Sequence, residues 1–173
     1  RREDLCKQIN EEHVNGRYLP SAKLPATLHA SGDLKTVLEG SSMVVFVAPS
    51  HATREVAQMA APHIPIDIPI VSATKGIENE SLMFMAEVLA AELPGKLRRN
   101  FAFLSGPSFA KELAAQLTTA VVIASHSVEV AQRVMRAFHA PYLRLYSSDD
   151  VVGVERGGAL KNVIAIAAGI VDG

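Results

Sequence analysis

The sequence predicts an α/β fold with a doubly wound, mostly parallel sheet, and two observations carry that prediction. Short runs rich in β-branched residues alternate along the chain with segments that carry apolar residues at helical spacing. Strands and helices alternating at these lengths are typical of right-handed crossovers between parallel strands. The first run, MVVFVA at 43–48, has no polar alternation, so we expect it to be covered on both faces.

The expected elements follow one another in a regular order. Strands are expected at residues 43–48, 68–73, 101–105, 120–125 and 142–147, and helices at about 4–12, 52–61, 81–93, 109–116, 128–138 and 151–171. The helix at 81–93 should place one apolar stripe against the sheet, made of Leu82, Met85, Ala86, Leu89 and Leu93. Asn15–Gly16 and two prolines make residues 15–28 an irregular connection.

The composition is that of an ordinary globular domain with a buried core. The 173 residues are 49% hydrophobic and 20% charged, with a net charge of -1, so no basic surface for nucleic acid or an anionic membrane is expected. No run reaches the roughly 20 apolar residues of a membrane span, and no signal peptide is recognisable. Cys6 is the only cysteine, which excludes internal disulfides and a cysteine-based metal site and favours the reducing cytoplasm.

Three expected strands are followed by turns that combine Gly or Pro with a reactive side chain. The turns are Pro49-Ser50-His51, Thr74-Lys75-Gly76 and Gly106-Pro107-Ser108. Ligands of open α/β sheets bind beyond the carboxyl ends of the strands, so the three turns are candidates to line one polar crevice.

The turn at 106–108 also has the sequence of a helix start that binds an anion. Gly106 permits a sharp turn, Pro107 suits the first helical position, and the free N–H groups beyond Ser108 attract negative charge. Simpler interpretations remain open for each turn: a plain helix start here, a solvated loop lysine at Lys75, and a surface histidine at His51.

The last expected helix, 151–171, carries one lysine in an apolar run. Asp149 or Asp150 would cap it, and its second half, NVIAIAAGIV, is apolar on every face and should be buried. Gly157 and Gly158 allow another backbone or a ligand to come close one turn before Lys161. A lysine held partly out of water exchanges protons near neutral pH, which makes Lys161 an acid–base candidate. The alternative is a lysine whose amine reaches solvent.

These segments resemble a known family. The blocks SATKGIE, SGPSFAKELA, TTAVVIAS and VGVERGGALKNVIAIAAGIVDG, together with NGRYLP and VAPSHATREV, occur in order and are similar to those of the bacterial type of NAD(P)-dependent glycerol-3-phosphate dehydrogenase. The resemblance implies a Rossmann-like cofactor domain and reversible hydride transfer between NAD(P)H and dihydroxyacetone phosphate, giving sn-glycerol 3-phosphate for glycerophospholipid synthesis.

The resemblance also implies roles for individual residues. Lys161 would transfer a proton at the substrate oxygen, with Asn162 orienting that lysine or the substrate. Lys75 would contact both cofactor and substrate. Gly106 and Ser108 would contact the substrate.

Cofactor contacts are expected at Ala110, Pro49 and Tyr18, although Tyr18 could equally be a packing residue. Arg1 and Arg2 match a basic pair after the second strand of the family's cofactor fold. Arginine there accommodates the 2′-phosphate of NADP, so NADP as well as NAD is expected. A solvated terminus is the alternative for the two arginines.

Two family features are expected outside the sequence. The glycine-rich phosphate loop should precede Arg1 by about 20 residues, and a helical domain with further substrate ligands should follow Gly173. Residues 1–148 are thus expected to be a cofactor domain truncated at its N-terminus, and 149–173 the first helix of the second domain. Two alternatives remain, another β-hydroxyacid or ketopantoate-type dehydrogenase and a non-catalytic NADP-binding module. A homodimer is left open.

Overall fold

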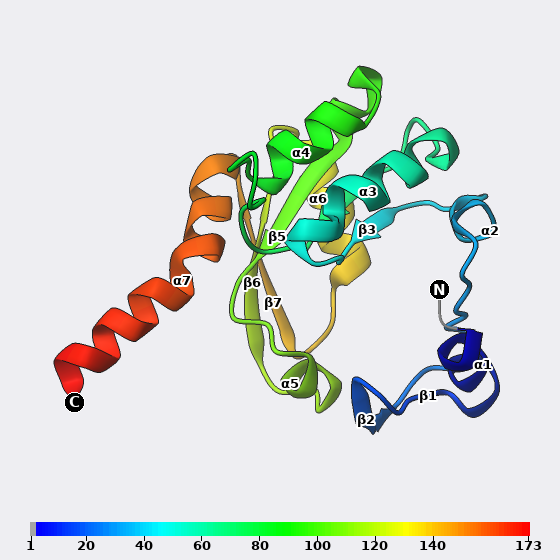
Figure 1. Cartoon of the computed structure of the whole chain (residues 1–173), viewed down its shortest axis with the longest axis horizontal. Helices are drawn as coiled ribbons and strands as arrows, with labels where there is room; N and C mark the ends of the chain where they lie inside the picture. Colours follow the sequence, from blue (N-terminus) through cyan, green and yellow to red (C-terminus); the bar gives the residue numbers. More distant parts are fainter. Residues whose placement is uncertain (1–2) are drawn as a thin grey trace.

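The computed structural model describes residues 3–173, and Arg1 and Arg2 lie outside that range. A five-stranded sheet forms its centre, in the order β3-β4-β5-β6-β7 (Figure 1). Its strands are β3 (Val44–Phe46), β4 (Ile70–Ser72), β5 (Phe101–Ser105), β6 (Thr119–Ala124) and β7 (Leu143–Ser148). Neighbouring strands are parallel except for β5 and β6, which are antiparallel. The predicted mostly parallel α/β sheet is therefore confirmed.

Seven α-helices accompany the sheet within residues 3–173. They are α1 (Glu3–Glu12), α2 (Leu34–Leu38), α3 (Ser50–Ala60), α4 (Met85–Glu92), α5 (Ala110–Ala114), α6 (Val128–Phe138) and α7 (Val151–Asp172). Two 3₁₀ turns, η1 (Ala61–His63) and η2 (Gly95–Asn100), and a small hairpin, β1 (Val14–Asn15) with β2 (Leu19–Lys23), complete the chain. The strand at 101–105 and the helix at 128–138 begin and end where the sequence predicts.

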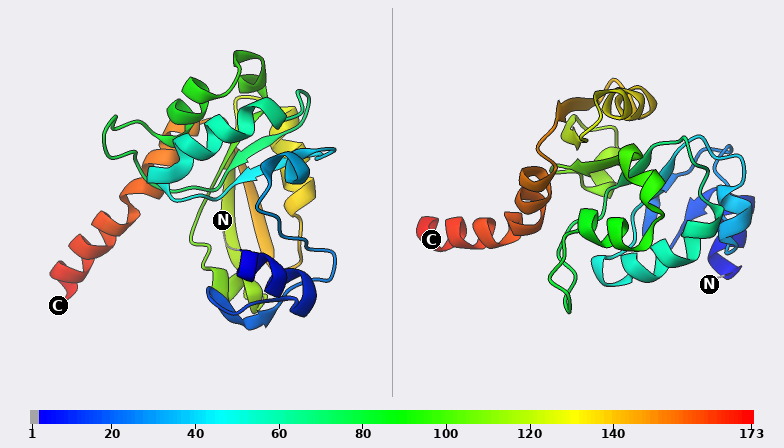
Figure 2. Two further views of the ribbon diagram at one scale, coloured as in Figure 1. Left: turned by 45° about the vertical axis from the view of Figure 1, so that its right-hand side comes forward. Right: turned by 90° about the horizontal axis from the view of Figure 1, so that it is seen from above.

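Helices cover both faces of the sheet (Figure 2). Ile70 and Phe103 face the side of α3 and α4, where they pack with Leu89 in one buried cluster. Val71 and Ile123 face the other side and pack with residues of α6. Since neighbouring residues of a strand point to opposite faces, the apolar runs of β4 and β5 supply two cores. This arrangement is the doubly wound fold that the sequence predicts.

The antiparallel pairing of β5 and β6 differs from a simple series of parallel crossovers. The helix between them, α5, has only five residues, and it lies at one end of β6 and β7 instead of over a face of the sheet (Figure 1). A crossover helix must run back along the sheet to bring the next strand in parallel. Because α5 does not run back along the sheet, β6 begins near the end of β5 and runs antiparallel to it.

Three local predictions for the first half of the chain are wrong. Residues 15–28 are not wholly irregular, since Leu19–Lys23 pairs with Val14–Asn15 as a hairpin. Leu82 is 72% exposed with a φ of 58°, so it lies outside α4 and its apolar stripe, while Met85 and Leu89 are buried as predicted. The run at 43–48 is not covered on both faces, because Val45 is 40% exposed on β3, an edge strand of the sheet in residues 3–173.

The first half of α7 packs against the sheet and the second half does not. Asp150 caps the helix by accepting a hydrogen bond from the Gly153 amide at 2.8 Å, and α7 then packs against β5 and β6. Beyond Lys161 the helix projects from the body (Figures 1 and 2), and Val163, Ile166 and Ile170 are 62 to 75% exposed. The predicted burial of this half is therefore wrong within residues 3–173, where no packed surface covers these side chains. None of the helices in this range is long and apolar enough to cross a membrane.

Candidate functional site

Lys75 joins two of the turns that follow the strands. It stands in the turn after β4, and its Nζ donates hydrogen bonds to the carbonyl oxygen of Gly106 at 2.7 Å and to Oγ of Ser108 at 3.2 Å. Burial disfavours its charged form, and the charge of Lys161 repels it, so the pKa of Lys75 is lowered from its ordinary value. Lys75 is therefore partly desolvated and close to a second cation.

The turns after β3 and β4 are also held together. Oγ1 of Thr74 donates to the carbonyl oxygen of Ala48 at 2.8 Å. Gly76 has a φ of +124°, and a Cβ there would lie 3.1 Å from Oγ of Ser50. His51 is not part of this arrangement, since it is exposed and lines a separate cavity with Arg54 and Glu78.

Gly106 occupies a position that only glycine fits well. Its φ is +146°, and a Cβ would lie 2.7 Å from the carbonyl oxygen of Ala120 and 2.9 Å from Cα of Val121. Both neighbours are backbone atoms of β6, which cannot move without disturbing the sheet. The turn between β5 and α5 therefore approaches β6 as closely as it does because residue 106 has no side chain.

We predict that Gly106→Ala destabilises the protein by more than about 1 kcal/mol, because the change adds a steric clash to an unfavourable φ. Thermal denaturation should show a fall in Tm of at least about 2 °C. Gly95→Ala is the matched control, since a Cβ at residue 95 meets no atom within 4 Å. Equal Tm values for the two variants would contradict this prediction.

Lys161 is brought towards the same turns by the close approach of α7 to β5. A Cβ at Gly158 would lie 2.6 Å from Oγ of Ser105 and 3.9 Å from Cγ of Lys75, so a glycine at this position lets the helix come near the strand. One turn later, Nζ of Lys161 lies 5.4 Å from the centroid of the Phe109 ring. A cation at that distance from a ring is attracted to its face. The ammonium group is thus held beside the turn after β5.

A cavity of about 340 Å³, called the lysine cavity below, opens beside Lys161. It is lined by Ser105, Gly106, Pro107, Val122, Gly153, Val154, Gly157, Gly158 and Lys161. The lining contains no carboxylate, and Lys75 donates to the same Gly106 that forms part of its wall. Lys161 in the lining and Lys75 behind the Gly106 wall bring two positive charges to this place, and this unbalanced charge favours an anionic ligand.

Four further candidates do not line this cavity. Asn162 is exposed on α7 and is not part of the cavity lining. Pro49 directly precedes α3, and Ala110 is the first residue of α5. Tyr18 is 62% exposed in the hairpin of β1 and β2, with the Arg17 guanidinium 5.4 Å from its ring centroid. This hairpin packs against α5, so Tyr18 and Ala110 belong to neighbouring elements.

Sequence reasoning missed three residues near the two lysines: Phe109, Ser105 and Glu155. Phe109 is 58% exposed, an unusual place for a phenylalanine, and its position directly after the Gly-Pro-Ser turn was the available signal. Ser105 ends β5 and meets α7 at Gly158. Glu155 is the one acidic residue in the apolar length of α7 before Asp172, which marks it for a specific partner.

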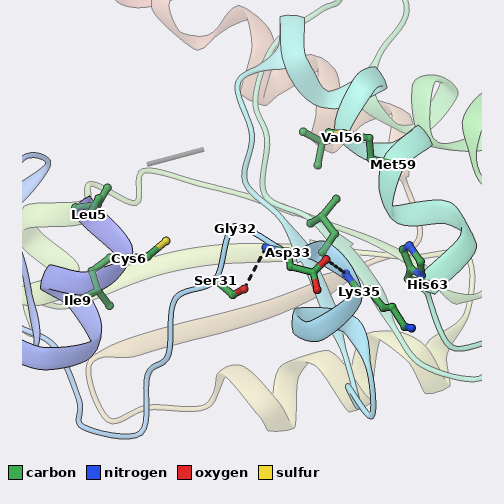
Figure 3. A pocket seen from close by; sticks show the side chains of 11 residues that line it. Leu5, Cys6, Ile9, Ser31, Gly32, Asp33, Lys35, Val56, Met59 and His63 are labelled. Atoms are coloured by element: carbon green, nitrogen blue, oxygen red, sulfur yellow. Dashed lines mark hydrogen bonds between the residues drawn. The ribbon is translucent and has the colours of Figure 1, made fainter. Parts of the chain in front are cut away.

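A second, larger cavity lies elsewhere in the molecule. It has a volume of about 650 Å³ and lies between α1, α2 and α3 (Figure 3). Its lining is mainly apolar and includes Leu5, Cys6, Val56, Met59 and His63. None of the candidate residues from the sequence lines it, whereas Gly106 and Lys161 line the smaller cavity. Residues 3–173 contain no cluster of three His, Cys, Asp or Glu side chains that could hold a metal ion.

The central sheet is mostly parallel, and the lysine cavity lies at the carboxyl ends of β4 and β5. These two features define a Rossmann-like α/β protein. A family model described as "NAD-dependent glycerol-3-phosphate dehydrogenase N-terminus" matches residues 1–131, and one described as the C-terminus of the same enzyme matches residues 150–173. The chain belongs to the NAD-dependent glycerol-3-phosphate dehydrogenase family.

Individual relatives agree with this assignment. The chain is 49% identical over its whole length to glycerol-3-phosphate dehydrogenase [NAD(P)+] of Leptospira biflexa, covering 52% of that protein. It is 52% identical to the enzyme of the same name from Anaeromyxobacter sp., over 98% of the chain and 51% of the relative. The chain therefore spans about half the length of the curated relatives it matches.

Solved structures show the same fold. Glycerol-3-phosphate dehydrogenase from Coxiella burnetii superposes with a TM-score of 0.85 at 40% identity, over 98% of this chain and 51% of that one. A ketopantoate reductase of Ralstonia eutropha superposes with a TM-score of 0.58 at 20% identity, over 89% of this chain and 49% of that one. This second likeness concerns the fold alone, so it does not favour a ketopantoate-type activity.

Proposed function

We propose that the protein is an NAD(P)H-dependent glycerol-3-phosphate dehydrogenase, which interconverts dihydroxyacetone phosphate and sn-glycerol 3-phosphate for glycerophospholipid synthesis. The observation that carries the proposal is that Lys161 lines a cavity without a carboxylate, while Lys75, whose charge interacts with that of Lys161, is bonded to Gly106 in the wall of the same cavity. Such a cavity suits a small phosphorylated ketone, which brings both a negative charge and an oxygen that must be protonated. Membership of the glycerol-3-phosphate dehydrogenase family supports the choice of this reaction.

The residues present fit a nicotinamide cofactor. Gly106, Gly157 and Gly158 leave part of the cavity wall without side chains, and Val122 and Val154 add apolar surface to it. A flat ring could rest against such a wall. When bound, the reduced nicotinamide supplies the hydride for the ketone carbon.

Proton transfer is assigned to Lys161. As the ketone carbon gains hydride, its C=O electron pair moves to the oxygen, and a nearby ammonium both stabilises and protonates that oxygen. Phe109 holds the ammonium near the Gly106 turn without accepting its proton, because an aromatic ring is not a base. The lysine is left neutral and takes a proton again from solvent, and the reverse reaction uses the neutral amine as base.

Lys75 is assigned to substrate positioning. Its ammonium is fixed by the carbonyl oxygen of Gly106 and the hydroxyl of Ser108, which leaves one N–H and its charge for a ligand. Holding the ketone at a fixed place beside Lys161 converts the reaction into an oriented, effectively unimolecular step. Gly106, Ser108 and Asn162 are proposed as further substrate contacts.

Cofactor contacts are proposed at Pro49, Lys75, Ala110 and Tyr18, and at Arg1 and Arg2 outside the described residues. Either NAD or NADP is proposed, with arginines supporting NADP. Residues 1–148 would belong to the cofactor domain and 149–173 to the second, a division supported by the separate matches of the two family models. A cytoplasmic location, supported by the single Cys6, and a homodimer complete the proposal.

Steady-state kinetics test the proposed function. The native, full-length protein should oxidise NADH or NADPH with dihydroxyacetone phosphate and should turn over 2-ketopantoate at least about 10³-fold less efficiently, because a cavity built for a phosphorylated ketone leaves its lysines unpaired with the wrong substrate. Comparable efficiency on both ketones would contradict the assignment. Binding of NADPH without reduction of either ketone would favour a non-catalytic module.

A further inference from the structure

Glu155 fastens α7 to the beginning of α4. Its Oε1 accepts a hydrogen bond from the Ala86 amide at 2.9 Å, a contact between residues 69 positions apart in the sequence. The next residue of α7, Arg156, places its guanidinium 5.9 Å from the ring centroid of Phe84, which directly precedes α4. Two neighbouring side chains of α7 therefore hold the same turn of α4. The amide of Ala86 is one of the groups that a helix leaves unpaired at its N-terminus.

The position of this contact along α7 matters for the lysine cavity. Gly158, which meets Ser105 of β5, lies one turn after Glu155, and Lys161 lies one turn further. Beyond Lys161 the helix is exposed, so residues 150–158 contain the contacts that set its direction. Six residues of helix rise about 9 Å, and a tilt of about 6° at Glu155 would therefore move Lys161 by about 1 Å.

The surroundings of Glu155 connect it with the proposed site. It lines a small closed cavity together with Lys75, Ser105 and Ser72. Ser72 is 1% exposed, and its hydroxyl has no hydrogen-bond partner among residues 3–173. The lining of this cavity is therefore mixed, with polar side chains beside apolar ones such as Phe103 and Val154. Glu155 thus shares a small cavity with Lys75, which itself contacts Gly106 in the wall of the lysine cavity.

We propose that Glu155 is a positioning residue for Lys161, because its carboxyl group fixes the angle at which α7 passes the turns that carry Lys75 and Gly106. Glu155 does not touch the substrate cavity, so it acts through the helix. The catalytic consequence rests on the proposed function. The attachment of α7 to α4 is a structural consequence and does not depend on the proposed function.

The protonation of Glu155 should modulate this attachment. Burial, together with the charge of Glu87 on α4, raises the pKa of Glu155 to about 7 against the opposing effect of the Ala86 and Met85 amides. Arg156 on the same helix and Lys75 across the small cavity are the cations nearby. Because this pKa is above the ordinary 4.5, the folded state binds the proton more tightly, and its contribution to stability is lost as pH rises from 4.5 through 7.

Kinetics of Glu155→Ala and Glu155→Gln in the native, full-length enzyme test the proposal. Glu155→Ala should lower kcat about 5- to 20-fold with the KM for NADPH within twofold, since a displaced proton donor affects turnover and not cofactor binding. Glu155→Gln keeps an acceptor oxygen for Ala86 and should stay within about threefold of wild type. We expect the wild-type kcat to change between pH 6 and 8 as Glu155 titrates, and the Glu155→Gln variant to lack this change.

Glu87→Ala is the matched control. Glu87 accepts the Phe84 amide at 2.8 Å, so its loss weakens the start of α4 without removing a hydrogen bond to α7. Its loss also removes a charge that raises the pKa of Glu155, so the two variants are compared at pH 8, where Glu155 is mainly ionised with or without Glu87. The kcat of Glu87→Ala should remain within twofold of wild type. Equal losses in Glu87→Ala and Glu155→Ala would show a general effect of α4 and overturn the proposal.

Amide hydrogen exchange gives a readout that does not depend on turnover. Glu155→Ala should speed exchange at residues 85–88 and 155–162 relative to both wild type and Glu87→Ala. Wild-type protein that reduces no ketone would overturn the proposed function, while faster exchange in Glu155→Ala would still support the attachment of α7. A folded Glu155→Ala with wild-type kcat and exchange would overturn the attachment. Should that variant not fold, a wild-type pH profile in Glu155→Gln would overturn it instead.

Discussion

Replacing Lys161 with alanine is expected to lower kcat about 10²- to 10⁴-fold in the native, full-length enzyme, the range for loss of a proton-transfer group. The ammonium of Lys161 lies at a cavity without carboxylates, beside the Phe109 ring. The other cation at this place, Lys75, is engaged by Gly106 and Ser108. Among residues 3–173, Lys161 is the one charged side chain that lines the cavity, so the loss should fall on kcat.

Steady-state assays with dihydroxyacetone phosphate, and fluorescence titration with NADPH, check this prediction. The Kd for NADPH should stay within about twofold of wild type, because α7 can keep its contacts through Glu155 and Gly158. Lys96→Ala serves as control, since Lys96 is exposed in η2 and its loss should leave kcat unchanged. A kcat near wild type for Lys161→Ala would remove Lys161 from the mechanism.

Lys161→Arg separates charge from proton transfer. Arginine keeps the positive charge and can stack on Phe109, yet it does not release its proton at physiological pH. We therefore expect the KM for dihydroxyacetone phosphate to stay within about threefold of wild type and kcat to remain at least about 10²-fold reduced. Recovery of kcat in this variant would mean that Lys161 acts by charge alone.

The fold could be predicted from the sequence where local patterns decide the outcome. β5 and α6 begin and end as predicted, because apolar runs and periodic spacing identify elements that pack on one sheet. Leu82 was misplaced because it fits the helical spacing, although α4 begins only at Met85. The direction of β6 depends on where the chain travels after β5, and a short helix such as α5 leaves no mark of that path in its spacing.

The candidate site could be predicted only in part, for a similar reason. Residues that follow strands meet at one edge of a parallel sheet, and Lys75 does join the turn at Gly106. The bond between Glu155 and Ala86 spans 69 positions, and no spacing rule connects residues so far apart. The apolar residues in the second half of α7 likewise indicate that this half is to be buried, but their spacing does not indicate which surface covers it.

Replacing Lys75 with methionine is expected to lower kcat/KM for dihydroxyacetone phosphate about 10²- to 10³-fold, with a rise in KM as the larger part. The change removes the charge and the free N–H that the proposed substrate would bind, and it releases the turn at Gly106 and Ser108. A hydrogen bond between a ligand and a charged group is worth about 1.5 to 3 kcal/mol. Initial-rate measurements over a range of substrate concentrations separate the two parameters. A KM within twofold of wild type would exclude Lys75 from substrate binding.

The same substitution should leave the fold at least as stable. Burial and the charge of Lys161 lower the pKa of Lys75 from its usual 10.5, so between the lowered value and 10.5 the unfolded chain binds more protons and stability rises with pH. At neutral pH the folded protein thus bears the free-energy cost of a partly buried ammonium beside Lys161. Methionine at this position has no such cost. We expect the Tm of Lys75→Met at pH 7 to equal or exceed that of wild type, while activity falls. A marked drop in Tm would show instead that Lys75 is there to hold the turn at Gly106, and that its place beside Lys161 follows from folding and not from substrate binding.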